Sequence, residues 1–302
     1  MAASPHRYAQ QVTEQIADTS AAAPAAPLRG LVTGYAGSRI VGFAPGVHRG
    51  LPTHHVGLII ALDQPIHLAA MPDRRQPPCS FQMLAHGLRT GPAAIVHEGN
   101  SYSVSVNLTP DGARRLLGVP AAALAGMALS LDELLGSMAA ALAERLAAAP
   151  DWPARFAVLD EVLTRRAGAG EQTAAVLTHM WRRIVDSGGC VTVAELAAET
   201  GYSRQHLRTL FAREYGVGPK QVARLVRFGR SHRMLRDLAR RRPPGRRVSL
   251  AEVAGRCGYY DQAHLARDWN ELAGCPPSAW LVSEELPFVQ DQPPDPVAPS
   301  GS

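Results

Sequence analysis

The sequence predicts an α+β fold, in which a small antiparallel β-rich half with helices precedes an all-helical half. The apolar pattern alternates residue by residue before Pro110 and follows a helical period after it. One helical motif also occurs twice between Thr192 and Trp280. The length of 302 residues exceeds what one hydrophobic core usually supports, so we expect two domains.

The first half begins with an arm and continues as strands. Residues 1–27 are rich in Ala, Ser and Pro and are expected to be a disordered arm. The apolar run His55–Leu62, the turn signal Asp63-Gln64-Pro65 and the run Ile66–Leu68 together predict a β-hairpin. Residues 102–108 alternate apolar with polar side chains, which predicts a half-buried strand.

Helical spacing replaces the alternating pattern from Thr109 onward. Residues 131–148 and 152–166 read as amphipathic helices rich in Ala and Leu. Gly168-Ala169-Gly170 is the best candidate for a linker. We therefore expect residues 28–168 to form one domain.

The second half repeats one pattern, first from Thr192 and again from Ser249. Six residues match at a spacing of 57, and five more match at 58 after one residue inserted in the turn. Each copy predicts two helices joined by a tight turn, because each holds a capping box, a glycine that ends the first helix and a short polar cap for the second. These signals are Thr192 with Glu195, Gly201 and Ser203 in one copy, and Ser249 with Glu252, Gly258 and Asp261 in the other.

The second helix of each copy leaves one polar face free. Arg and Gln pair with guanine and adenine edges in the major groove, where a helix-turn-helix places the start of its second helix. The candidate base-reading residues are Arg204, Gln205, Arg208, Thr209, Gln262, Ala263 and Arg267. Two plain helical hairpins with solvated faces would be an equal alternative for one copy alone. Two copies joined by a long basic helix favour DNA.

Positive charge is concentrated in the same half. Residues 171–280 hold 18 Lys and Arg against 10 Asp and Glu, whereas the rest of the chain holds 13 against 16. The helix predicted between the repeats carries arginines at helical spacing, which suit phosphates better than bases. The candidate contacts to the DNA backbone are Ser203, His206, Arg224, Arg227, Arg230 and His264.

Residues in both copies match the pattern of a known protein family. In the first copy they are Leu196-Ala197, Gly201-Tyr202-Ser203, His206-Leu207, Phe211, Gly216 and Pro219. In the second they are Val253-Ala254, Cys257-Gly258-Tyr259, Asp261-Gln262-Ala263-His264-Leu265, Arg267, Trp269, Gly274 and Pro277. On these residues the chain resembles the DNA-binding domain of the AraC/XylS family of bacterial transcription regulators. The resemblance implies two helix-turn-helix units, bridged by a rigid helix, that reach successive major-groove segments on one DNA face.

The resemblance gives the expected boundaries of the second half. The DNA-binding domain spans 171–286, with helix-turn-helix units at 192–215 and 249–272 and a linker helix at 219–240. Residues 287–302 are Pro-rich and are expected to be a disordered tail. The chain departs from the family in having Trp269 and Trp280 where Phe and Tyr are commoner. Ala263 and Ala266 also leave the second reading helix with few long side chains.

Residues 30–167 resemble, more weakly, the N-terminal domains of actinobacterial AraC-type regulators. The resemblance depends on short pieces, Pro45–Pro52 and Leu108-Thr109-Pro110. It implies a half that senses a small molecule or mediates dimerisation.

Histidines are the most tempting chemical feature of the first half, and they are His48, His54, His55, His67, His86 and His97. A cupin-like metal site would need a His-x-His pair and a carboxylate on facing strands. His54 and His55 are adjacent and on a strand would point to opposite faces. We therefore predict no metal and no cofactor. A metal-dependent cupin-like enzyme domain fused to a DNA module stays as an alternative.

The four cysteines form no Cys-x-x-Cys pair, so neither a zinc knuckle nor a disulfide framework is indicated. Cys257 is expected to be a small buried filler, with a redox sensor as the alternative. No apolar run could cross a membrane, and residues 1–10 lack a signal-peptide pattern, so we expect a cytoplasmic protein.

These observations together predict a sequence-specific transcription regulator without enzymatic activity, whose partner is double-stranded DNA. A small-molecule effector, RNA polymerase and a second copy in a homodimer are further candidate partners. A non-specific, nucleoid-type DNA binder is the other alternative, and the alanines of the second reading helix are its only support.

Overall fold

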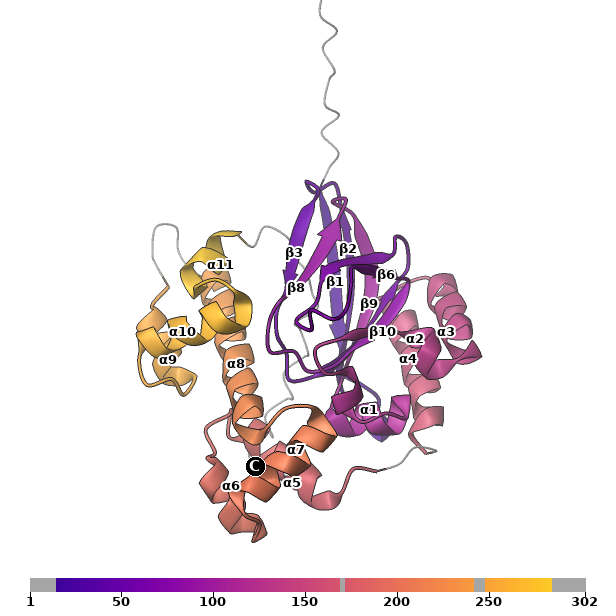
Figure 1. Cartoon of the computed structure of the whole chain (residues 1–302). Coiled ribbons are helices and arrows are strands. Elements are labelled where there is room, and N and C mark those ends of the chain that lie inside the picture. The colour runs from indigo at the N-terminus through magenta and orange to yellow at the C-terminus, as the bar shows by residue number, and fades with distance from the viewer. Residues whose placement is uncertain (1–14, 169–171, 242–247, 284–302) are drawn as a thin grey trace, which may run out of the picture.

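The computed structural model describes residues 15–168, 172–241 and 248–283. The fold is mixed α+β, as predicted: antiparallel strands occupy the first half, and the second half is helical (Figure 1). None of the helices in the described ranges combines the length and hydropathy needed to cross a bilayer.

Six antiparallel strands form the larger sheet. Their order is β1 (Ile16–Ala22), β2 (Val32–Val41), β9 (Ser101–Leu108), β4 (Val56–Ala61), β7 (Met83–His86) and β10 (Ala128–Ser130). The expectation of a disordered arm is wrong for residues 16–22, because β1 pairs with β2 along its whole length. Backbone hydrogen bonds hold this strand in the sheet, and they do not depend on side-chain type. The Ala-rich composition of the segment therefore did not predict a strand. Residues 1–14 lie outside the described ranges.

A second antiparallel sheet has the order β3 (Gly46–Gly50), β8 (Ala93–His97), β5 (Ile66–Ala70) and β6 (Cys79–Phe81). The hairpin predicted around Asp63-Gln64-Pro65 is therefore wrong, since β4 and β5 belong to different sheets. The reason is burial: all six residues of β4 are buried between β7 and β9, whereas a hairpin exposed to solvent would keep a polar face.

The two sheets pack face to face through a small apolar cluster, which contains Ile59 and Leu84 from the larger sheet and Leu68 and Ile95 from the smaller. The opposite face of the larger sheet contributes Leu58, Ile60, Val104 and Val106 to the main core, which also includes the helices. Both faces of β9 are consequently covered. Its polar residues Ser103, Ser105 and Asn107 are buried, so the prediction of a half-buried strand is wrong.

Helices cover the larger sheet and lead to the second half. They are α1 (Pro110–Leu117), α2 (Leu131–Leu135), α3 (Ser137–Ala148) and α4 (Trp152–Ala167), with short 3-10 turns η1 (Ala26–Leu28) and η2 (Ala121–Leu124). The single helix predicted over 131–148 is interrupted at Gly136, whose φ of 59° and ψ of −140° leave the helical region. Tyr35 of β2 donates to Asp160 of α4 at 2.8 Å and so ties that helix to the sheet.

Seven helices form the described part of the second half. They are α5 (Ala175–Asp186), α6 (Val193–Thr200), α7 (Arg204–Tyr215), α8 (Pro219–Arg241), α9 (Leu250–Arg256), α10 (Gln262–Ala273) and α11 (Pro277–Ser283). The long helix α8 extends from the α5–α7 group to the α9–α11 group (Figure 1). Phe228 and Ser231 of α8 contact the buried Trp269 of α10, whose indole N–H donates to the Ser231 hydroxyl at 2.9 Å. This contact anchors the last three helices on α8.

Candidate nucleic-acid interface

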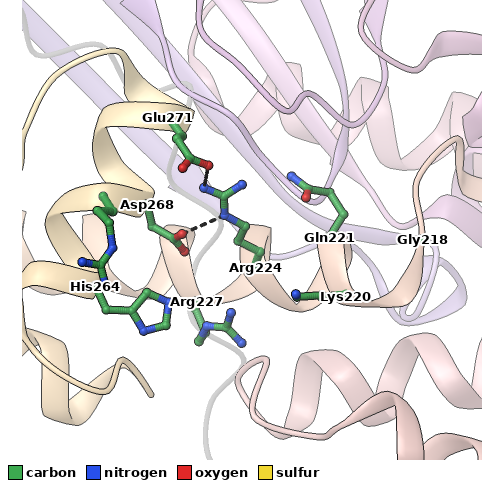
Figure 2. Close-up of a pocket in the computed structure, with 9 residues that line it drawn as sticks. Gly218, Lys220, Gln221, Arg224, Arg227, His264, Asp268 and Glu271 are labelled. Atoms are coloured by element: carbon green, nitrogen blue, oxygen red, sulfur yellow. Dashed lines mark hydrogen bonds and ion pairs between the residues drawn. The ribbon is translucent and has the colours of Figure 1, made fainter.

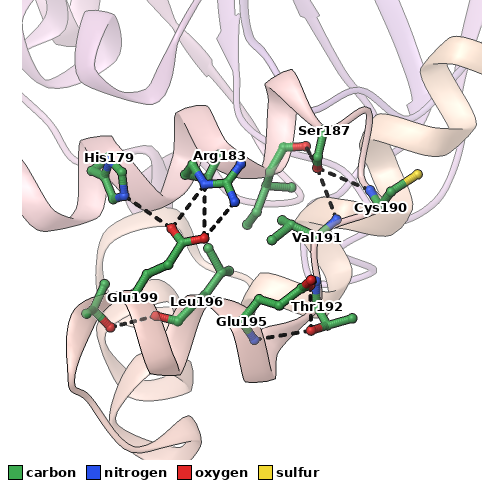
Figure 3. Close-up of polar contacts among 11 residues, drawn as sticks. His179, Arg183, Ser187, Cys190, Val191, Thr192, Glu195, Leu196 and Glu199 are labelled. Carbon is green, nitrogen blue, oxygen red and sulfur yellow. Dashed lines mark hydrogen bonds and ion pairs between the residues drawn. The ribbon is translucent and has the colours of Figure 1, made fainter.

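The first helix-turn-helix unit consists of α6 and α7, and its ends are fixed by local hydrogen bonds. The Thr192 hydroxyl accepts from the Glu195 N–H at 3.2 Å, and the Glu195 carboxylate accepts from the Thr192 N–H at 2.7 Å (Figure 3). Gly201 ends α6 with a φ of 72°, and the Ser203 hydroxyl accepts from the His206 N–H at 3.1 Å. The predicted capping box, turn glycine and cap are thus confirmed.

Helix α5 supports this unit through Glu199, a contact that local sequence signals did not reveal. Arg183 of α5 donates to both carboxylate oxygens of Glu199 on α6, at 2.6 and 3.0 Å (Figure 3). The His179 ring lies 3.4 Å from the same carboxylate. Hydrogen bonding to Arg183 lowers the pKa of Glu199 below its usual value.

The second unit consists of α9 and α10 and follows the same plan with one difference. The Ser249 hydroxyl accepts from the Glu252 N–H at 3.2 Å, and the Asp261 carboxylate accepts from the His264 N–H at 2.6 Å. Only half of the predicted capping box is present here: the Glu252 carboxylate lies 3.4 Å from the guanidinium of Arg256, one helical turn further on, and the structure shows no bond from the Ser249 N–H to it.

The second helix of each unit, α7 or α10, is the predicted reading helix, and it presents its predicted base-reading residues to solvent. Leu207 and Phe211 of α7, and Leu265 and Trp269 of α10, are fully buried on the opposite faces. The exposed side chains are Arg204, Gln205, Arg208 and Thr209 on α7, and Gln262, Ala263 and Arg267 on α10. Both faces are therefore free to meet a DNA groove.

The two histidines and the serine expected at the DNA backbone occupy the helix starts. Ser203 and His206 are exposed at the start of α7, where the His206 ring lies 4.8 Å from that of Tyr202. His264 is half-buried against the Tyr259 ring, with centroids 5.2 Å apart, and its Nδ1 accepts from the Tyr260 N–H.

The three arginines expected at DNA phosphates have hydrogen-bond partners within the protein. Arg224 donates to Asp268 at 2.8 Å and pairs with Glu271, both on α10. Arg227 donates to the Gly189 carbonyl at 2.6 Å and lies over the Tyr259 ring. Arg230 donates to the carbonyls of Gly188 and Arg256, at 3.4 and 3.3 Å. These side chains brace α8 against both helix-turn-helix units. The stripe of arginines was visible in the sequence, but their acceptors come from distant segments.

A groove of about 640 Å³ lies between the start of α8 and α10 (Figure 2). It is lined by Gly218, Lys220, Gln221, Arg224, Arg227, His264, Arg267, Asp268 and Glu271. Lys220, which the sequence interpretation left out, is exposed at the α8 end of the groove. The groove joins residues of the second reading helix to the segment that follows the first.

The first half contacts the far end of α7. Arg114 of α1 donates to both oxygens of Glu214 at 2.9 and 2.7 Å, and Glu214 is only 7% exposed. The Thr173 N–H also donates to Asp111 of α1 at 3.1 Å. A Cβ added to Gly216 would lie 2.4 Å from the Ala125 side chain, so the backbone that follows α7 packs tightly against the first half.

His54 and His55 depart from expectation, since they lie in a bend before β4 with their ring centroids 3.9 Å apart, not on opposite faces of a strand. Burial lowers the pKa of His55 to about 4 and that of His86 to about 3. No group of three or more His, Cys, Asp or Glu residues that could hold a metal ion occurs within the described ranges. Cys257 is buried with its sulfur 3.9 Å from that of Met234, as a packing role requires.

Comparison with known proteins agrees with this geometry for the second half. Residues 196–282 match a family described as a helix-turn-helix domain. No curated protein matched the sequence. Among solved structures, ToxT from Vibrio cholerae is 10% identical with a TM-score of 0.46, over 89% of this chain and 98% of that chain. A probable AraC family transcriptional regulator from Rhodopseudomonas palustris is 25% identical with a TM-score of 0.31, over 36% and 96%.

Two helix-turn-helix units joined by one helix define the second half as a DNA-binding module of the kind found in transcription regulators. Residues 196–282 form a helix-turn-helix domain of the AraC type, as the sequence predicted. The actinobacterial resemblance of residues 30–167 stays a prediction.

Proposed function

We propose that the protein is a sequence-specific transcription regulator that reads two adjacent major-groove segments with α7 and α10. The observation that carries this proposal is the pair of outward polar faces, each opposite a fully buried apolar face. Arg204, Gln205, Arg208 and Thr209 would read one segment. Gln262, Ala263 and Arg267 would read the other, with Ser203, His206 and His264 at the phosphates that flank the helix starts.

Rigid coupling of the two units supports simultaneous reading. Successive major-groove segments on one DNA face are separated by a fixed helical turn, so the two reading helices need a fixed separation. Arg227 connects α8 to the segment before α6 through Gly189 and to the second unit through Tyr259. Arg224 ties α8 to α10. We assign these arginines to holding the units in register, in place of the phosphate contacts expected from the sequence.

For the first half we propose a modulating role without enzymatic activity. The domain of residues 28–168, extended by strand β1, contacts α7 through Arg114 and Glu214. A small molecule or a second copy of the chain that altered α1 would therefore act on the first reading helix. RNA polymerase is a further candidate partner.

The test is a footprint of the full chain on the DNA upstream of its own gene, with Arg208→Ala and Arg267→Ala beside the wild type. Each lost arginine contact should cost about 1–3 kcal/mol at particular base pairs and leave binding to random duplex nearly unchanged. Two neighbouring protected segments, each weakened by one variant, would support the proposal.

A non-specific DNA binder stays the alternative, because Ala263 has only a short side chain on the exposed face of α10. Less than about 10³-fold preference for the footprinted site over random duplex would favour that alternative.

A further inference from the structure

The two acidic residues that line the groove between α8 and α10 share one arginine as their partner. Asp268 is buried and accepts from Arg224 at 2.8 Å, and Glu271 pairs with the other end of the same guanidinium (Figure 2). Arg224 offsets only one of these two negative charges, so the groove is positive overall through its other cations. Of the remaining lining side chains, Lys220, Arg227 and Arg267 carry positive charge.

Two of these cations have no partner among the residues that the structure describes. In the described part of the chain, Lys220 and Arg267 are exposed and make no ion pair or side-chain hydrogen bond. Arg208 of the first reading helix extends the same path, because its Cγ would lie 3.5 Å from a Cβ placed on Gly218, which also lines the groove. Positive charge that no described residue pairs with therefore continues from Arg208 on α7, past Lys220, to Arg267 on α10.

The position of this path indicates what it binds. Two reading helices that occupy successive major-groove segments on one face of DNA must straddle the sugar–phosphate backbone between those segments. The groove runs from the segment that follows α7, at Gly218, to α10. We propose that it seats the phosphates of this backbone segment, with Lys220 as the cation that contacts them. The proposal rests on the proposed function, because it assumes that both helices reach DNA together.

Lysine suits this role better than base reading. Its ammonium is a compact charge on a flexible stem, which attracts phosphate without the fixed fork by which arginine selects guanine. Lys220 is also the only lysine of the 302 residues, whereas Arg supplies the other 30 of the 31 basic side chains. Its amine therefore gives a chemical probe of one position in the unaltered protein.

The first experiment measures affinity against salt for the full chain, with Lys220→Ala, Lys220→Gln and Lys220→Arg. Loss of one phosphate contact should reduce the slope of log affinity against log salt by about 0.9, equally on the footprinted site and on random duplex. Lys220→Arg keeps the charge and should keep the slope. Arg182→Ala is the matched control, because it removes an exposed charge on α5 beside Gly30, far in sequence from the groove residues.

Thermal unfolding of each variant separates a folding defect from a lost contact. An unchanged slope in Lys220→Ala and Lys220→Gln, in variants that unfold at the wild-type temperature, would overturn the proposal. So would an equal loss in Arg182→Ala, since the effect would then reflect net charge alone.

The second experiment acetylates the wild-type protein with a succinimidyl ester, and peptide mass mapping quantifies the label on Lys220. DNA should protect Lys220 several-fold. A clear footprint with an unprotected Lys220 would reject the groove assignment and leave the proposed function intact. Protection by random duplex without any discrete footprint would reject sequence-specific reading and keep the groove as a phosphate seat.

Discussion

Glu214 links the two halves of the chain through its side chain. Its carboxylate is almost fully buried at the end of α7 and receives two hydrogen bonds from Arg114 of α1. A buried carboxylate without its cation retains the cost of desolvation and loses the attraction that offsets it. The pair therefore holds α1 against the first reading helix as long as both residues are present.

We expect Arg114→Ala to destabilise the protein by roughly 3 kcal/mol, the lower end for a broken buried pair, because the Arg114 side chain is 21% exposed. The double variant Arg114→Ala/Glu214→Gln should recover much of this loss, since it removes the unpaired charge. Urea unfolding of the four proteins in the cycle measures the coupling. Additive losses would show that the two side chains do not interact in solution.

Helix α8 determines how the two helix-turn-helix units are oriented, and its arginines allow a test of that role. Arg227→Ala removes the bond to the Gly189 carbonyl and the contact with Tyr259. We expect the unfolding midpoint to fall and specific affinity to weaken, while the salt slope of DNA binding stays at the wild-type value. A slope lower by about one would instead return Arg227 to a phosphate contact.

The elements also show which parts of the structure can be predicted from sequence. Thr192, Gly201 and Ser203 act on neighbours within a few positions, so their residue types alone place the ends of α6 and α7. Strand partners depend on segments far away, and the sequence pattern could not show that β4 lies in a sheet different from that of β5. The same limit applies to Arg224, whose partner Asp268 lies 44 residues further along the chain. The helical spacing of Arg224 and its neighbouring arginines predicted an unpaired basic face, whereas the structure pairs Arg224 with Asp268.

At the scale of the whole molecule, buried histidines should govern stability in mild acid. Burial holds the pKa of His54 well below its usual value, that of His55 at about 4, and those of His86 and His232 at about 3. These rings are therefore neutral in the folded state, whereas the unfolded chain protonates them near pH 6.5. The unfolded state thus binds more protons below that pH, so stability is complete above about pH 6.5 and falls as the pH drops toward the folded values.

Titration of Glu195 and Glu199 lies below the pH range in which the histidines lower the stability. The pKa values of Glu195 and Glu199 are lowered in the folded state, so their contribution is lost only as the pH falls below the usual value of 4.5. Between pH 7 and pH 5 each neutral histidine should cost about 2 kcal/mol of unfolding free energy. Urea unfolding at the two pH values measures the total. His86→Gln in the first half and His232→Gln in the second should each reduce the acid-dependent loss by about that amount, whatever their stability at pH 7. A loss equal to that of the wild type in both variants would mean that these rings are already protonated in the folded protein, or solvated enough to titrate normally.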